Sequence, residues 1–146
     1  MHKIVLATAV SLLAVIPSAF GADHHLLNGT WTLVSTEGSG SEIRNAQITI
    51  KDREHNIYVS RNFTYDGPGE TVTTNFTTDG REHATIREGH TFKCKAKWEG
   101  DVLKVTTVGD QGTEVERYSL APDGTMMLQV ERSGRPPLTL HFRRED

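Results

Sequence analysis

Two arginines are the side chains of this sequence best suited to hold the acidic group of a ligand. Arg61 lies between Val59 and Phe63, in a segment where apolar residues recur at every second position. A guanidinium is a two-pronged donor that matches a carboxylate, and a buried one needs a partner because an unpaired buried charge is costly. Arg117 is the second candidate, although Tyr118 could equally mark the inner side of its segment. Either arginine is exposed if its strand faces the other way.

Histidine and cysteine form no recognisable catalytic or metal signature in this sequence. No two histidines have the i, i+4 spacing of a helical metal site, and no Gly-x-Ser-x-Gly motif supplies a nucleophile. We therefore expect no catalytic residue, no metal and no cofactor. Cys94 is the single cysteine, so no disulfide forms within the chain, and its alternation with apolar residues predicts a small buried side chain.

Short strands and tight turns must position these side chains. Asp-Gly, Glu-Gly and Ser-Gly pairs recur between Asp66-Gly67 and Ser133-Gly134, and turns about every 8–12 residues indicate an antiparallel sandwich or barrel. Segments rich in Thr, Val, Ile and aromatic residues predict strands at 30–37, 46–51, 56–65, 70–78, 82–87, 90–98, 102–108, 113–120, 125–132 and 137–144. The expected fold class is all-β, a single antiparallel up-and-down β-barrel of about 8–10 strands.

Alternation along the strands predicts which side chains face the interior. In the segment 90–98, Phe92 and Ala96 face one way, and Lys93 and Lys95 face the other. The lysine side is either an anion-binding face or, as we favour, a solvated outer face. Apolar residues on the inner lines are the expected ligand-binding set beside Arg61 and Arg117: Phe63, Phe76, Phe92, Leu128 and Leu140. Small inner residues favour a cavity, although a packed core in another register fits the same pattern.

The first 21 residues have the character of a secretory signal peptide. Lys3 precedes an apolar run from 4 to 16, and small residues flank a cleavage point after Gly21. We expect residues 1–21 to be removed and residues 22–146 to form one barrel domain in the periplasm or outside the cell, with no membrane-spanning segment. Loss of Lys3 takes the net charge from −3 to −4, which gives no reason to expect nucleic acid as a partner.

The sequence Asn28-Gly29-Thr30-Trp31 resembles the Gly-x-Trp start of the calycins, the superfamily of lipocalins and fatty-acid-binding proteins. In those proteins the Trp plugs one end of the barrel and a basic residue of the last strand packs against it, which implies Arg143 or Arg144 here. The turn Lys97-Trp98-Glu99-Gly100 and the step from Ser119 to Asp123-Gly124 are similar to those of small exported bacterial lipocalin-like proteins.

The segment from 113 to 143 also resembles the closing strands of fatty-acid-binding proteins. On that match, Arg117 takes the place of an inward arginine that holds the ligand's carboxylate. The family's Arg-x-Tyr pair is replaced here by Leu140-His141-Phe142, and the segment 38–45 is too short for the family's two helices. A fatty-acid head-group site of the usual kind is therefore not expected.

These features together predict non-enzymatic binding or transport of a small hydrophobic molecule inside the barrel. One alternative is a ligand-free envelope interaction module with a packed barrel core, and another is an enzyme with its groups at the barrel mouth. The sequence indicates neither the identity of the ligand nor the oligomeric state. On the first hypothesis, replacing Arg117 with Leu weakens the binding of an anionic ligand.

Overall fold

The computed structural model describes residues 24–38, 43–53, 56–64, 70–87 and 89–146, so the expected signal peptide lies outside the described residues. A short 3-10 helix, η1 (His24–Leu27), precedes ten strands. The strands are β1 (Gly29–Glu37), β2 (Asn45–Arg53), β3 (Asn56–Thr64), β4 (Glu70–Thr77), β5 (Glu82–Arg87), β6 (His90–Glu99), β7 (Val102–Gly109), β8 (Gly112–Leu120), β9 (Met126–Arg132) and β10 (Leu138–Arg144). Their bounds lie close to those predicted from the turns and the alternation.

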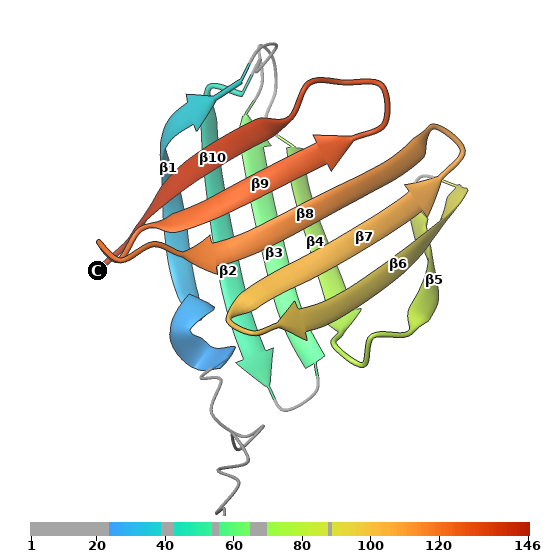
Figure 1. Ribbon diagram of the computed structural model, residues 1–146, viewed down its shortest axis with the longest axis horizontal. Helices are drawn as coiled ribbons and strands as arrows, with labels where there is room; N and C mark the ends of the chain where they lie inside the picture. The colour runs from blue at the N-terminus through green and yellow to red at the C-terminus, as the bar shows by residue number, and fades with distance from the viewer. Residues whose placement is uncertain (1–23, 39–42, 54–55, 65–69, 88) are drawn as a thin grey trace, which may run out of the picture.

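The ten strands form a single antiparallel sheet in the order β4-β3-β2-β1-β10-β9-β8-β7-β6-β5. Strands that follow one another in the chain are paired, apart from β4 and β5, whose described parts are not. In addition, the first strand, β1, pairs with the last, β10. The sheet curls into a half-barrel, so that β1 to β4 form one layer behind the crossing strands β7 to β10 (Figure 1). The predicted all-β up-and-down fold class is confirmed.

The turns have the predicted chemistry. Gly100, between β6 and β7, has a φ of 62°, which a residue with a side chain rarely adopts. Between β8 and β9, the carboxylate of Asp123 accepts hydrogen bonds from the backbone N–H and the hydroxyl of Thr125, at 3.0 and 2.6 Å. Such local bonds hold a tight turn closed and fix the register of the strands on either side.

One end of the half-barrel is plugged by Trp31, as the Gly-x-Trp start implies. The side chain is fully buried, and its Nε1 donates a hydrogen bond of 2.9 Å to the carbonyl of Leu27 in η1. The guanidinium of Arg144 lies 4.4 Å from the centre of the Trp31 ring and donates to the carbonyls of Leu26 and Asn28, at 2.6 and 2.7 Å. Of the two candidate arginines, Arg144 therefore makes the cation–π contact.

Large apolar side chains fill the half of the interior next to Trp31, which we call the closed half. Every second residue of each central strand points into it, as the alternation predicts. Its fully buried members are Trp31, Ile48, Ile50, Ile57, Val59, Leu103, Tyr118, Met126, Leu128, Leu140 and Phe142. The opposite half, which we call the mouth half, contains the turns at 109–112 and 133–137 and is less densely filled.

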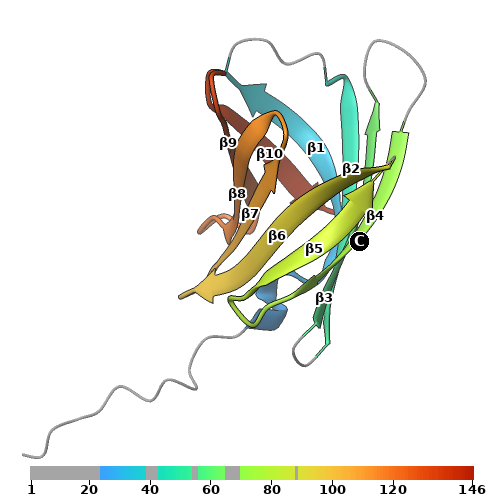
Figure 2. The ribbon, with the colours of Figure 1, turned by 90° about the vertical axis from the view of Figure 1, so that its right-hand side faces the viewer.

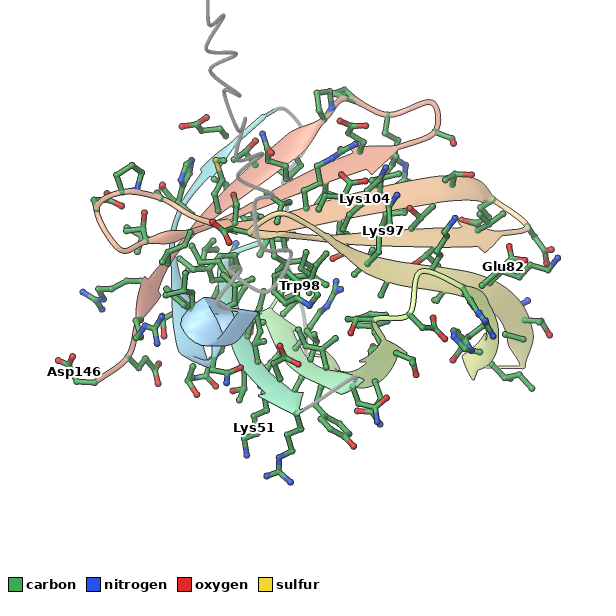
Figure 3. All side chains as sticks on the ribbon, turned by 60° about the horizontal axis from the view of Figure 1, so that its bottom comes forward. Lys51, Glu82, Lys97, Trp98, Lys104 and Asp146 are labelled. Carbon is green, nitrogen blue, oxygen red and sulfur yellow. The ribbon has the colours of Figure 1, made fainter. Side chains whose placement is uncertain are left out.

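The lysine line of β6 lies on the outer face, as predicted. Lys97 and Lys104 lie on the outer side of the sheet and Trp98 on the inner side (Figure 3). The ammonium groups of both lysines lie 3.1 and 3.6 Å from the carboxylate of Glu99. Paired charges of this kind are typical of a solvated surface rather than of a site that attracts anions.

Candidate ligand-binding site

A line of polar side chains on β8 separates the closed half from the mouth half. Alternation along β8 turns Glu114, Glu116 and Tyr118 inward, whereas Arg117 points outward. Glu116 and Tyr118 are buried, with 4% and 0% of their surfaces exposed. Two carboxylates and a phenol in a sheet interior need partners from other strands, because a buried charge is stable only when it is paired and hydrogen-bonded.

Arg61 of β3 is the partner of Glu116. Its Nη2 lies 2.6 Å from Oε2 of Glu116, and its side chain is 16% exposed. The hydroxyl of Tyr118 donates a second hydrogen bond to Oε2 of Glu116, at 2.7 Å, and the guanidinium lies 5.9 Å from the centre of the Tyr118 ring. The three side chains therefore form a compact network across the interior, from β3 to β8.

The electrostatics of this network are set by burial and by the close opposite charges. Burial opposes the positive charge of Arg61, but the charge of Glu116, its hydrogen bond to Arg61 and the nearby Tyr118 and Glu114 together raise the pKa of the guanidinium. Burial likewise opposes the negative charge of Glu116, but the charge of Arg61 and the hydrogen bonds from Arg61 and Tyr118 lower the pKa of this carboxyl group. Burial raises the pKa of the Tyr118 phenol. The network therefore holds one positive and one negative charge near neutral pH.

A second charged pair lies nearer the mouth. Glu114 of β8 is opposite Arg132 of β9, and Nε of Arg132 lies 3.5 Å from Oε2 of Glu114. Burial and the negative charge of Glu116 raise the pKa of the Glu114 carboxyl group, although Arg132 and Arg61 act in the opposite direction. Nε of Arg132 and Nε of Arg61 are both buried, and neither has a hydrogen-bond acceptor among the described residues. Nε of Arg132 therefore contacts Glu114 as an ion pair without a well-aligned hydrogen bond.

Three of these charged groups, but not Arg61, line a recess of about 230 Å³ that opens at the barrel mouth, which we call the mouth recess. Phe92 of β6 and Thr107 of β7 form its side walls, and the turns at 109–113 and 133–135 form its rim. The inner surface is supplied by Glu114, Glu116 and Arg132. The mouth recess thus combines an aromatic wall with charged groups, as ligand pockets commonly do.

A second recess, of about 160 Å³, lies between β4 and β5, whose described residues are not paired with each other. Phe76, Ala84 and Cys94 are among its lining residues. Cys94 is buried as predicted, and its Sγ lies 3.6 Å from the hydroxyl of Thr107, which also lines the mouth recess. Figure 2 shows this side of the molecule, with β5 and β6 crossing β4. A ligand in either recess would therefore lie close to Cys94 or Thr107.

The structure brings together part of the predicted ligand-binding set. Arg61 and Phe92 lie at or beside the mouth recess, and Phe76 lines the second recess. Phe63 faces inward and packs against the core as a half-buried residue.

Three predicted residues are not placed to meet a ligand. Leu128 and Leu140 face inward as predicted, but they are 0% and 1% exposed within the closed half, with no free surface for a ligand. Arg117 lies on the outer face, where its Nη1 donates to Oε1 of Glu131 at 3.0 Å. The expected role of Arg117 inside the barrel is therefore corrected, because Tyr118 and Glu116 occupy the inner line of β8.

Glu114, Glu116 and Arg132 were missed by reasoning from the sequence. Their signal is alternation: both glutamates lie on the i, i+2 line of Tyr118, and Arg132 continues the line that runs through Leu128. Once Tyr118 is taken as inward, the same count places the glutamates inside and Arg117 outside. The pairing of Arg61 with Glu116, which are 55 residues apart, depends on the curvature of the sheet.

The described part of the chain contains no cluster of three or more His, Cys, Asp or Glu side chains arranged to hold a metal. In the same part, no helix has the length and apolar character that a membrane crossing requires.

Solved structures with this fold are matched along almost their whole length. Human cRBP IV has a TM-score of 0.67 and 18% identity, over 82% of this chain and 98% of that chain. A Schistosoma mansoni fatty acid binding protein in complex with arachidonic acid has a TM-score of 0.67 and 15% identity, over 84% and 98%. A mutant of the fluorescent protein UnaG has a TM-score of 0.68 and 13% identity, with the same coverage. No family model and no curated protein matches the sequence. Likeness at these identities shows the fold alone: this chain folds as these structures do, and its own sheet is a single curled antiparallel sheet of ten strands.

Proposed function

We propose that this chain binds a small hydrophobic ligand, without catalysis, in the mouth half of its interior. The observation that carries the proposal is the mouth recess, which reaches from the barrel opening to the buried Glu116 between the walls made by Phe92 and Thr107. Its 230 Å³ is slightly below the roughly 300–1,000 Å³ of typical ligand pockets. The ligand is therefore compact, or it inserts one end and leaves the rest at the rim.

Two further features support a site in the interior rather than on the outer face. Structures of similar fold include proteins named for binding fatty acids, which makes a ligand in the barrel a natural use of this architecture. The outer lysines of β6 and β7 are in part already paired with glutamates, so that face offers little free charge.

The ligand-free interaction module remains the rival proposal, and the filled closed half favours it. Side chains such as Trp31, Leu128 and Leu140 are fully buried, so this half of the interior serves as an ordinary core. The two proposals differ in the mouth recess, which is a binding site on the first and an incidental surface hollow on the second.

We further propose that the chain acts after export, as a periplasmic or secreted protein of the bacterial lipocalin-like kind. The support is the apolar run behind Lys3 and the small residues before Ala22. Intact mass measurement of the chain purified from the exporting cell is expected to give a protein that begins at Ala22. A mass that includes residues 1–21 would contradict export by cleavage.

A matched pair of variants tests the binding proposal. Thr107→Phe places a ring in the mouth recess, whereas Thr106→Phe adds the same ring to the outer side of β7. We expect the first variant to lose at least about tenfold in affinity for a compact fluorescent alcohol such as 2-naphthalenemethanol. The second variant should bind like the wild type. Equal binding by all three proteins would exclude the mouth recess and favour the interaction module, provided that thermal unfolding shows both variants folded.

A further inference from the structure

The charges of the inner part of the mouth recess are balanced in pairs, whereas Arg135 belongs to its exposed rim. Arg61 is matched by Glu116 at 2.6 Å, and Arg132 is matched by Glu114 at 3.5 Å. A ligand with an anionic head group gains little from either arginine, because each positive charge already has a negative neighbour. An uncharged head group with a hydroxyl can instead donate to the carboxylate of Glu114 or Glu116, which both line the recess.

The two pairs differ in how firmly they are held. Glu116 is 4% exposed, at hydrogen-bond distance from Arg61, and accepts a second bond from Tyr118. Glu114 has the longer contact to Arg132, also interacts with the carboxyl group of Glu116, and lies nearer the opening. Glu114 is therefore the carboxylate whose charge can be removed while the Arg61–Glu116–Tyr118 network stays intact.

We propose that Glu114 sets the head-group specificity of the mouth recess: as a carboxylate it neutralises Arg132 and favours an uncharged amphiphile, and loss of its charge lets Arg132 hold an anionic one. This inference rests on the proposed function, since it concerns which hydrophobic molecules the mouth recess accepts.

Acidification should change the affinity for anionic ligands in the same direction as removal of the Glu114 charge by substitution. The charged and titratable groups facing Glu114 are Glu116 on its own strand, Arg132 on β9 and Arg61 on β3, and Arg135 of the turn at 133–137 lines the same recess. Its neighbour on β7 is Thr107, which does not titrate, and β6 presents Phe92 and Cys94. Burial and Glu116 raise the pKa of Glu114, so this carboxyl group takes up a proton at a higher pH than an ordinary glutamate. Anionic ligands should consequently bind better as the pH falls.

The test compares two probes that differ in head group and share a compact ring. Naphthalene-2-sulfonate is anionic at every working pH, and 2-naphthalenemethanol is uncharged. We expect Glu114→Gln to bind the sulfonate about tenfold more tightly than the wild type, which corresponds to about 1.4 kcal/mol. Binding of the alcohol should change by less than about twofold. In the wild type, affinity for the sulfonate alone should rise between about pH 8 and pH 5.

Two control variants separate a local effect from a general one. Glu131→Gln removes the same charge from the outer face, where Glu131 pairs with Arg117, and should leave both affinities unchanged. Adding Arg132→Gln to Glu114→Gln should abolish the gain for the sulfonate, because the released positive charge is then absent. A gain of equal size in Glu131→Gln would overturn the proposal, as would a gain that survives the loss of Arg132.

The outcomes also distinguish this inference from the proposed function. Binding of the alcohol with an unchanged affinity for the sulfonate in Glu114→Gln overturns the role of Glu114 and leaves the ligand site standing. Failure of both probes to bind any of the folded proteins overturns the ligand site and, with it, the specificity inferred for Glu114.

Discussion

Replacement of Arg61 by Met tests how far the buried network holds the sheet together. The change removes the positive partner of Glu116, whose side chain is 5% exposed, and leaves an uncompensated carboxylate in the interior. Breaking a buried pair in this way typically costs about 3–5 kcal/mol. Glu116 also lines the mouth recess, so partial access to water places the expected loss near the lower limit, at about 3 kcal/mol at pH 7. Urea unfolding followed by tryptophan fluorescence measures the loss.

The pH dependence gives this prediction a second, signed test. In the wild type the pKa of Glu116 is lowered on folding, so its contribution to stability is present above the unfolded pKa of about 4.3 and is lost as the pH falls through the folded value. In Arg61→Met the folded pKa of Glu116 rises instead, and the carboxyl group can be buried neutral at acid pH. The stability difference between the two proteins should therefore shrink as the pH is lowered.

Matched variants define the result that would refute this reasoning. Arg117→Met makes the same change on the outer face, where the partner Glu131 is exposed, and should cost no more than about 0.5 kcal/mol. Arg61→Met with Glu116→Leu removes both charges and should recover most of the loss, because no buried charge is left unpaired. A loss below about 1 kcal/mol in Arg61→Met at pH 7, or no recovery in the double variant, would show that the pair is not an integral part of the core.

Arg144→Ala should lower the free energy of unfolding by about 2 kcal/mol, since it removes the contact with the Trp31 ring and the hydrogen bonds to the carbonyls of Leu26 and Asn28. Arg143→Ala, at the neighbouring exposed position, is the control for urea unfolding. An equal loss of unfolding free energy in both variants would contradict the stabilising contact between Arg144 and Trp31. Cys94 should react slowly with a thiol reagent in the folded protein, because its side chain is buried. A reaction as fast as that of the urea-unfolded chain would contradict this burial.

The sequence was informative about the fold because turn chemistry and alternation act locally. The Asp-Gly and Glu-Gly turns define where strands end, and the alternation around Phe92 and Cys94 was enough to separate the inner from the outer face of β6. The same reasoning failed at Arg117, since β8 has apolar residues on both of its faces. The inner face of β8 is identified instead by Glu116, which pairs with Arg61 on the distant strand β3.

The site itself was less predictable than the fold. Leu128 and Leu140 were correctly assigned to the inner face, but their complete burial depends on how the two layers of the curled sheet pack together. The mouth recess depends on convergence of β6, β7, β8 and β9, and no local pattern encodes that convergence. Arg61 was recognised as a buried cation in need of a partner, and the structure supplies the partner from the protein itself.

The position of a bound probe tests the central claim most directly. Nuclear Overhauser contacts between 2-naphthalenemethanol and the protein, measured in solution, report which side chains lie within a few ångströms of the ring. We expect contacts to the methyl group of Thr107 and to the ring of Phe92, which form the walls of the mouth recess. Contacts confined to the outer face, such as the exposed Tyr58, would contradict a ligand site inside the barrel.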